Sequence, residues 1–185
     1  MSLSIALLTA PFFMNFPTKL TYNTSASAPV GFYRITAAIT LNRGVYTLVL
    51  PPPGFRVMAA TRQYLPLNVP LIKRVVGLSG DMICRRGQTI FVNQKPVATA
   101  LLKDHRGRNM PIWQGCFILS EDQFFALMTA TDSFDGRYFG PLNTKDIIGV
   151  AVPIFTWTPE DGENLYEYKT NQDKEQKDGA KRKAR

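Results

Sequence analysis

Short runs of β-branched and aromatic residues, each bounded by Gly, Pro or Asn, recur along most of the chain. Runs of this composition are typical of β-strands rather than helices. The run at 89–95 also resembles a strand that enters a hairpin turn. The pattern therefore predicts a mainly β fold, with strands at 31–35, 44–50, 70–76, 89–95, 116–119 and 147–152.

Two other windows are compatible with short helices. Residues 55–64 follow a triple proline, and residues 121–128 open after Ser120, which would serve as an N-cap. The second window also suits a strand, because its run Phe-Phe-Ala-Leu-Met is apolar throughout. The 13 prolines and 13 glycines among the 185 residues favour a turn-rich β fold over a helical bundle.

The composition changes at both ends of the chain. Residues 3–16 carry no charge and no Lys or Arg precedes them, but a membrane-spanning helix needs about 20 apolar residues. Residues 1–20 are therefore interpreted in one of three ways: as a short or interfacial anchor, as an export signal, or as the interior of a longer chain whose true start codon lies upstream of Met1. Residues 21–158 form the expected folded domain, and the charged residues 159–185 are expected to be disordered.

The formal net charge is +8 at pH 7, and its location matters. From residue 160 to the end the chain holds seven basic and seven acidic residues, so the excess lies in the rest of the chain. A basic body suits nucleic acid or anionic lipid headgroups. Because the sequence has no nucleic-acid-binding motif and begins with an apolar segment, we expect membrane lipid and no nucleic acid as a partner.

The chain has two cysteines, Cys84 and Cys116. An even number permits one disulfide in an exported protein, and two buried thiols are the alternative. Together with the lone His105 they make no standard zinc site, and the spacing of Asp132 and Asp135 matches no calcium loop. We expect no metal and no other cofactor.

Small hydroxyl residues crowd ahead of a proline and a glycine in NTSASAPVGFY, residues 23–33. Two of them are Ser25 and Ser27. A solvated turn would use the same residue types. The other interpretation is that one serine is a nucleophile, which requires a base elsewhere in the chain.

A candidate base lies in the expected strand LIKRVV, residues 71–76. Lys73 would share one face of that strand with Leu71 and Val75. Loss of hydration there would lower the pKa of the ammonium group, and a lysine that is neutral near pH 7 can accept the proton of a serine. The alternative is a surface lysine whose charged end reaches water. His105, in the charged stretch 103–108, is interpreted as a solvated loop residue.

The segment TDSFDGRYFGP, residues 131–141, interleaves charged and aromatic side chains. Its charged groups are Asp132, Asp135 and Arg137. A carboxylate–guanidinium pair in this segment would brace a functional site, or it would hold together a structural loop.

Taken in chain order, these three segments resemble the motifs of the type I signal peptidase superfamily, and specifically its conjugative-transfer branch, the TraF-type peptidases. NTSASAPVGFYR is similar to the nucleophile box of that branch, with a serine two residues before a proline and then Gly-x-Tyr. LIKRVVGLSGD is similar to the lysine box, and SFDGRYFGPL to the box Ser-x-Asp-Ser-Arg-Tyr-Phe-Gly-Pro. GQTIFVNQKPV and GRNMPIWQGC resemble the segments between them, so the resemblance extends from residue 23 to residue 152.

The resemblance implies roles for five residues. Ser27 is the expected nucleophile and Lys73 the expected general base of a Ser/Lys dyad. Ser25 is expected to help the Ser27 N–H hold the oxyanion. Asp135 and Arg137 are expected to support Lys73 or the serine loop.

Two positions depart from the pattern of the branch. Ser79 stands where proline usually precedes the Gly-Asp pair, and Gly136 stands where a serine is frequent. In many relatives that serine hydrogen-bonds the catalytic lysine. The glycine therefore leaves Lys73 without an assigned orienting partner.

The resemblance implies an antiparallel β fold of the signal-peptidase/LexA-like kind, with one or two short helices. The implied function is that of a membrane-associated serine endopeptidase at the periplasmic face of the bacterial inner membrane. Its expected partners are membrane lipid, other conjugation proteins and a pilin precursor, which some systems join into a ring. A serine acyl-enzyme accounts for linear and cyclic products, because water or the substrate's own amine can take the acyl group.

Three alternatives compete with this interpretation. A general type I signal peptidase would release exported proteins, but its nucleophile box has one more residue before the proline. A LexA-like self-cleaving repressor would need a DNA-binding domain before residue 23. A catalytically silent assembly factor of the conjugation machinery would not depend on Ser27 or Lys73.

Overall fold

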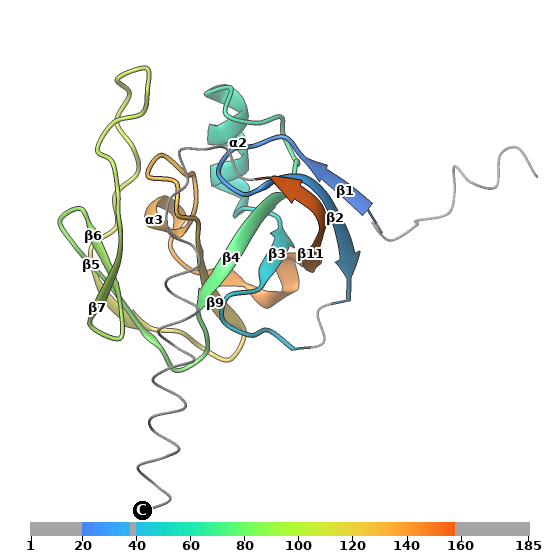
Figure 1. Ribbon diagram of the computed structural model, residues 1–185. Coiled ribbons are helices and arrows are strands. Elements are labelled where there is room, and N and C mark those ends of the chain that lie inside the picture. Colours follow the sequence, from blue (N-terminus) through green and yellow to red (C-terminus); the bar gives the residue numbers. More distant parts are fainter. Residues whose placement is uncertain (1–19, 38–39, 158–185) are drawn as a thin grey trace, which may run out of the picture.

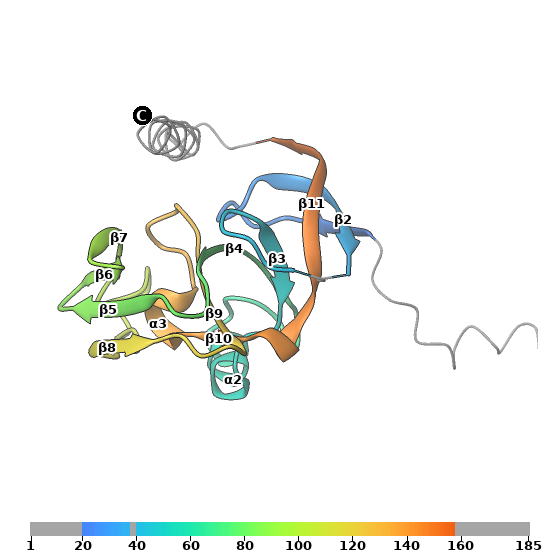
Figure 2. The same cartoon turned by 90° about the horizontal axis from the view of Figure 1, so that it is seen from below.

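Residues 20–37 and 40–157, which the computed structural model describes, form two antiparallel β-sheets (Figure 1). Seven strands make the larger sheet, in the order β1-β2-β11-β3-β4-β9-β10. Figure 2 shows β11 as its longest element, a curved strand beside β2. The seven strands are β1 (Leu20–Asn23), β2 (Val30–Thr36), β3 (Tyr46–Val49), β4 (Leu71–Gly77), β9 (Gln123–Leu127), β10 (Leu142–Asn143) and β11 (Ile147–Trp157).

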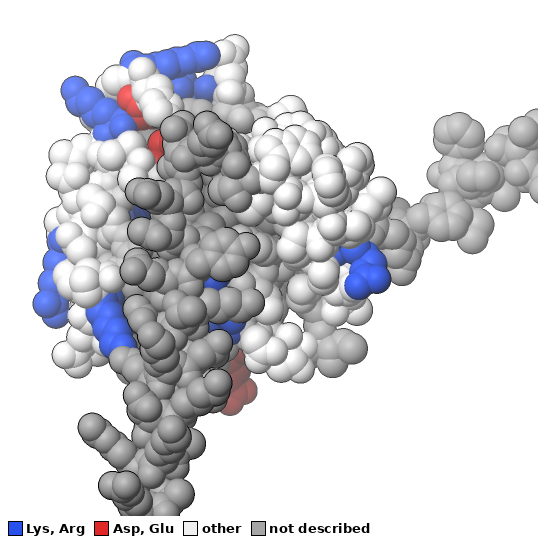
Figure 3. Space-filling view, viewed as in Figure 1, with Lys and Arg blue, Asp and Glu red and all other residues white. Residues whose placement is uncertain are grey.

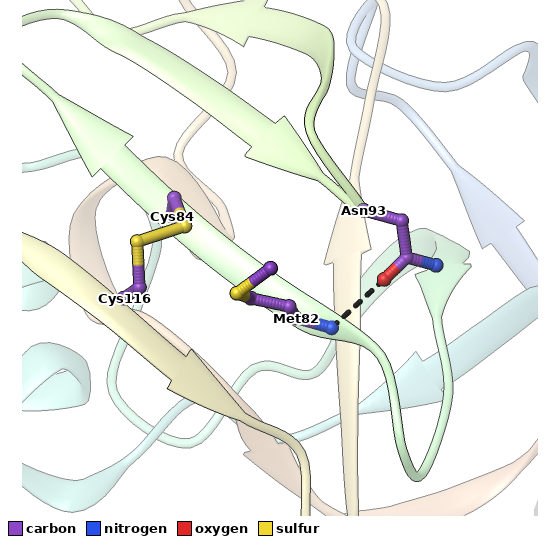
Figure 4. The surroundings of a disulfide bond; sticks show 4 residues. All are labelled: Met82, Cys84, Asn93 and Cys116. Atoms are coloured by element: carbon purple, nitrogen blue, oxygen red, sulfur yellow. Dashed lines mark hydrogen bonds between the residues drawn. A yellow bond between two sulfur atoms is a disulfide. The ribbon is translucent and has the colours of Figure 1, made fainter.

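Four strands make the smaller sheet, which lies at the end of the molecule opposite β1 and β2 (Figures 1 and 2). The order is β7-β6-β5-β8, and the strands are β5 (Met82–Arg86), β6 (Thr89–Val92), β7 (Lys95–Thr99) and β8 (Gly115–Ile118). Asn93 and Gln94 join β6 to β7 with φ angles of 49° and 68°, which suit a two-residue hairpin turn. The Asn93 side chain also accepts a hydrogen bond from the Met82 N–H at 2.9 Å, so the turn is tied to β5 (Figure 4).

A disulfide joins the two cysteines of the smaller sheet (Figure 4). Cys84 on β5 lies directly opposite Cys116 on β8, because the two strands pair in that register. The bond closes a loop of 32 residues in sequence and thereby limits the freedom of the unfolded chain. Of the two interpretations of the cysteine pair, the structure contains the disulfide.

In the described part of the chain, three short helices accompany the sheets: α2 (Pro53–Thr61), α3 (Gly136–Phe139) and the 3-10 helix η1 (Thr144–Asp146). Helix α2 occupies most of the window 55–64 in which a helix was expected. It starts earlier, at a proline, because the first turn of a helix does not need the N–H group that proline lacks. Within the described ranges, no helix is long and apolar enough to cross a bilayer.

The helical interpretation of residues 121–128 is wrong, and its strand alternative is correct, because Gln123–Leu127 form β9. Side chains of β9 alternate between two apolar clusters. Phe124 and Ala126 pack in the core of the larger sheet, whereas Phe125 and Leu127 pack with residues of the smaller sheet. A strand that is buried on both faces has the continuous apolar sequence that a buried helix also has.

The mainly antiparallel β fold predicted from the sequence is confirmed. Each expected strand exists, although its ends differ by a few residues. The pattern missed β1, β5, β7 and β10, which are short and contain polar residues or proline. The proposed N-terminal anchor, except Leu20, and the charged tail from residue 159 lie outside the described residues.

Candidate active site

A cavity of about 1040 Å³ lies where the loop between β1 and β2 faces the beginning of β4. Ser25 and Ser27 line it from that loop, and Lys73 lines it from β4. Residues 129–134, which follow β9, form a further wall. Three segments that are far apart in the sequence therefore meet at one cavity, and they are the three that the sequence motifs singled out.

Lys73 is buried, with 2% of its surface exposed. Its strand lies between β3 and β9 in the larger sheet, and the Thr47 hydroxyl donates to the Lys73 carbonyl oxygen at 3.1 Å. The Lys73 Nζ donates a hydrogen bond to Ser133 Oγ at 2.8 Å. The interpretation of Lys73 as a surface lysine with its charged end in water is therefore wrong.

This environment lowers the pKa of Lys73 from 10.5 to about 8. The main cause is burial, because an ammonium group that loses its hydration is destabilised. The charge of Arg137 also lowers the pKa, whereas the carboxylates of Asp135 and Asp132 raise it. The result is an amine that exchanges its proton near neutral pH, as a general base must.

Ser133 is a site residue that the sequence reasoning did not single out. It is buried, and its hydroxyl accepts the hydrogen bond from Lys73. Gly136 could not hold a partner for Lys73 without rearrangement, since a Cβ there would lie 2.8 Å from the Ala126 carbonyl oxygen. The orienting role that the glycine left open is therefore filled three residues earlier, inside the same motif.

Asp135 and Arg137 lie behind the wall of the cavity, and both are almost fully buried. The Asp135 carboxylate accepts hydrogen bonds from the N–H groups of Met128 at 2.9 Å and Arg137 at 3.1 Å. The Arg137 guanidinium lies 3.5 Å from Asp135. It donates to the carbonyl oxygens of Met128, Ala130 (2.6 Å) and Thr131 (3.0 Å). The pair thus fixes the loop that carries Ser133.

Ser25 and Ser27 face each other on the exposed side of the cavity. Their hydroxyl oxygens are 2.9 Å apart, and the Ser27 N–H donates to Ser25 Oγ at 3.3 Å. A hydroxyl and a main-chain N–H therefore lie beside Ser27 Oγ. Both groups are able to donate hydrogen bonds, which is the property that an oxyanion hole requires.

His105 and Asp132 belong to the rim of the same cavity. His105 is 79% exposed and its Nε2 lies 3.0 Å from Asp132 Oδ2, which agrees with a solvated loop histidine. The disulfide is in the smaller sheet, and neither cysteine lines the cavity. Among the described residues, no group of three His, Cys, Asp or Glu side chains is arranged to hold a metal ion.

Comparisons with known proteins find relatives of this chain. The family model described as signal peptidase, peptidase S26, matches residues 1–157. The plasmid transfer protein TraF of Escherichia coli is 32% identical over 146 residues, which cover 73% of this chain and 82% of that protein. A probable conjugal transfer protein TraF of Sinorhizobium fredii is 32% identical over 148 residues, 74% of this chain and 77% of that protein. The crystal structure of a signal peptidase I from Enterococcus faecalis aligns with a TM-score of 0.35 and 19% identity, over 60% of this chain and 97% of that one.

Replacing the buried lysine is expected to stabilise the fold at neutral pH. Below about pH 8 the folded protein holds a buried ammonium that the unfolded chain keeps in water. Lys73→Met should therefore raise the free energy of unfolding at pH 7 by about 2 kcal/mol. The gain should shrink between pH 8 and 10.5, because the wild-type amine is then neutral when folded while the unfolded chain still binds the proton.

Urea denaturation at pH 7 and pH 10.5 measures this difference, with the exposed Lys95→Met as a matched control that should show little change. A gain of equal size at both pH values, or a loss at both, would contradict a buried ammonium at neutral pH.

Proposed function

Because this chain belongs to the signal peptidase family, peptidase S26, we propose that it is a serine endopeptidase of a conjugative transfer system, with Ser27 as nucleophile and Lys73 as general base. The observation that carries the proposal is that a half-buried serine, Ser27, and a buried amine of lowered pKa, that of Lys73, line the same cavity. The family model supports peptidase activity, and the TraF proteins support the conjugative context.

In the proposed reaction the neutral Lys73 amine takes the proton of Ser27 while Ser27 Oγ attacks the carbonyl carbon of the scissile peptide. The Ser27 N–H and the Ser25 hydroxyl donate to the oxyanion that forms. Lys73, now an ammonium, returns the proton to the leaving amine, and an ester links the substrate to Ser27. Ser133 keeps the lysine side chain directed into the cavity throughout.

The proposed substrate is a pilin precursor of the same transfer system. Water attacking the ester would give a linear product and free the enzyme. The amine at the other end of the substrate would instead close a ring, with Lys73 again accepting the proton of the attacking group. Exclusion of water from the cavity would favour the ring.

Intact mass spectrometry of a pilin precursor, co-expressed with the enzyme, tests the dyad. Wild type is expected to process the precursor, and Ser27→Ala and Lys73→Ala to leave it intact, because each removes one half of the dyad. Ser79→Ala and Lys95→Ala are matched controls outside the cavity and should behave like wild type. A product one water lighter than the linear fragment indicates a ring, and equal processing by all variants would overturn the proposal.

The rate of processing should depend on the protonation of Lys73. Since only the neutral amine accepts a proton, kcat/KM is expected to rise with pH and to level off above about pH 8. Asp132→Asn should move the midpoint to lower pH, because the Asp132 carboxylate raises the pKa of Lys73. Asp122→Asn, in an exposed turn, is the control. A profile that is flat from pH 5 to 9 would rule out a lysine base.

A membrane location is supported by an exposed aromatic patch at the edge of the larger sheet. It consists of Leu20, Tyr22, Phe32, Ile154, Phe155 and Trp157, each at least 43% exposed. The Tyr22 ring lies 4.8 Å from Phe32 and 6.4 Å from Trp157. Figure 3 shows the surface on this side of the molecule with few charged groups. Aromatic side chains of this kind are enriched where proteins meet the headgroup region of a bilayer.

The position of the patch relates it to the reaction. Tyr22 belongs to the patch and also lines the cavity, so a bilayer at the patch would lie beside the reacting serine. The disulfide between Cys84 and Cys116 supports the periplasmic side of the membrane, because such bonds persist in oxidising compartments.

Quenching of tryptophan fluorescence by brominated lipids tests this orientation. The chain has two tryptophans, so Trp113→Phe leaves Trp157 as the reporter and Trp157→Phe leaves Trp113, which packs against Phe117 and Phe125. On vesicles containing brominated and anionic lipid we expect strong quenching of Trp157 and weak quenching of Trp113. Equal quenching of the two, or none of Trp157, would contradict the proposed orientation.

A further inference from the structure

The loop that carries the proposed nucleophile has little main-chain structure of its own. It comprises residues 24–29 and joins β1 to β2. Among the described residues, its one internal main-chain hydrogen bond runs from the Ala28 N–H to the Ser25 carbonyl oxygen and is 3.4 Å long. A loop with so few internal contacts does not by itself fix a hydroxyl to the precision that catalysis requires.

The side chain of Asn23, the last residue of β1, supplies the missing contacts. Its Oδ1 accepts a hydrogen bond from the Ser25 N–H at 3.1 Å. Its Nδ2 faces three carbonyl oxygens: those of Ser25 at 2.8 Å, Ala28 at 3.1 Å and Pro29 at 3.0 Å. One amide group thus holds the loop on both sides of Ser27.

We infer that Asn23 is the positioning residue of the oxyanion site, acting through the loop main chain rather than on the substrate. This inference rests on the proposed function of Ser27. The contacts fix both main-chain groups of Ser25, and hence the direction of its hydroxyl toward Ser27. The grip on Ala28 and Pro29 fixes the main chain on the far side, so the Ser27 N–H is held as well.

The chemistry of the amide explains why asparagine is required. It is the shortest side chain that offers an acceptor and two N–H donors at once. An aspartate would keep the acceptor for the Ser25 N–H but would turn a carboxylate oxygen toward three carbonyl oxygens, which repel it. The loop would remain attached through the Tyr33 hydroxyl, which donates to the Pro29 carbonyl oxygen at 2.6 Å and does not involve Asn23.

Asn23→Asp is therefore expected to lower kcat for pilin-precursor processing by about 10- to 100-fold, somewhat less than direct loss of an oxyanion donor. KM should stay within about twofold, because the walls of the cavity other than the loop are unchanged. Asn23→Ala should lower kcat less, with KM again within about twofold, because it removes the donors without adding repulsion. The midpoint of the pH–rate profile should stay in place in Asn23→Ala, since Lys73 and Ser133 are untouched and no charge is added. The new carboxylate of Asn23→Asp lines the cavity and should move the midpoint to higher pH, because a nearby negative charge raises the pKa of Lys73.

The controls separate this inference from the proposed function. Asn143→Asp, at a position whose side chain makes no cap hydrogen bond, should leave kcat unchanged. If Ser27→Ala is inactive but Asn23→Asp and Asn23→Ala both keep the wild-type kcat, the inference is overturned and the proposed function stands. A fully active Ser27→Ala would overturn the proposed function and the inference with it. A shifted pH midpoint in both Asn23 variants would show that the residue acts through Lys73, and this too would overturn the inference.

Discussion

The burial of one ammonium group governs the chemistry proposed for this protein. Lys73 loses its hydration inside the sheet, and the carboxylate that most favours its charged form, that of Asp135, is already paired with Arg137. An unpaired carboxylate at that place would hold the lysine in its charged form. Because the guanidinium opposes it, the loss of hydration dominates and the pKa of Lys73 falls to about 8. The Ser133 hydroxyl then orients the Lys73 amine through a hydrogen bond and carries no charge that would stabilise the ammonium form.

The fold positions the Lys73 amine through β9, because this strand belongs to both halves of the core. Its alternate side chains enter the cluster of the larger sheet and the cluster shared with the smaller sheet. The loop that carries Ser133 starts where β9 ends, and the buried Arg137 ties its carbonyl oxygens together. Arg85 of the smaller sheet, which follows Cys84, donates to the Arg137 carbonyl oxygen at 2.8 Å. The disulfide-linked sheet therefore supports the loop from behind.

The opposite wall of the cavity is built differently. There the proposed nucleophile lies on a partly exposed loop, and the side chain of Asn23, together with the Tyr33 hydroxyl, replaces the missing main-chain hydrogen bonds. The same strand carries Tyr22, which belongs to the aromatic patch. A rigid, buried base and a nucleophile next to a proposed membrane surface suit an enzyme whose substrate arrives from a bilayer.

The sequence alone determined the local features: the β-rich pattern, the order of the motifs, and the candidates Ser27 and Lys73. These are properties of short segments, in which side-chain alternation and turn residues are visible directly. It did not distinguish helix from strand at 121–128, because burial on both faces erases the alternation. Only the tertiary structure decided that Lys73 is buried and that Ser133 is its partner. It alone also showed that Asn23 holds the serine loop. Burial and hydrogen bonds between distant segments depend on how strands pair, and strand pairing is not encoded within any one segment.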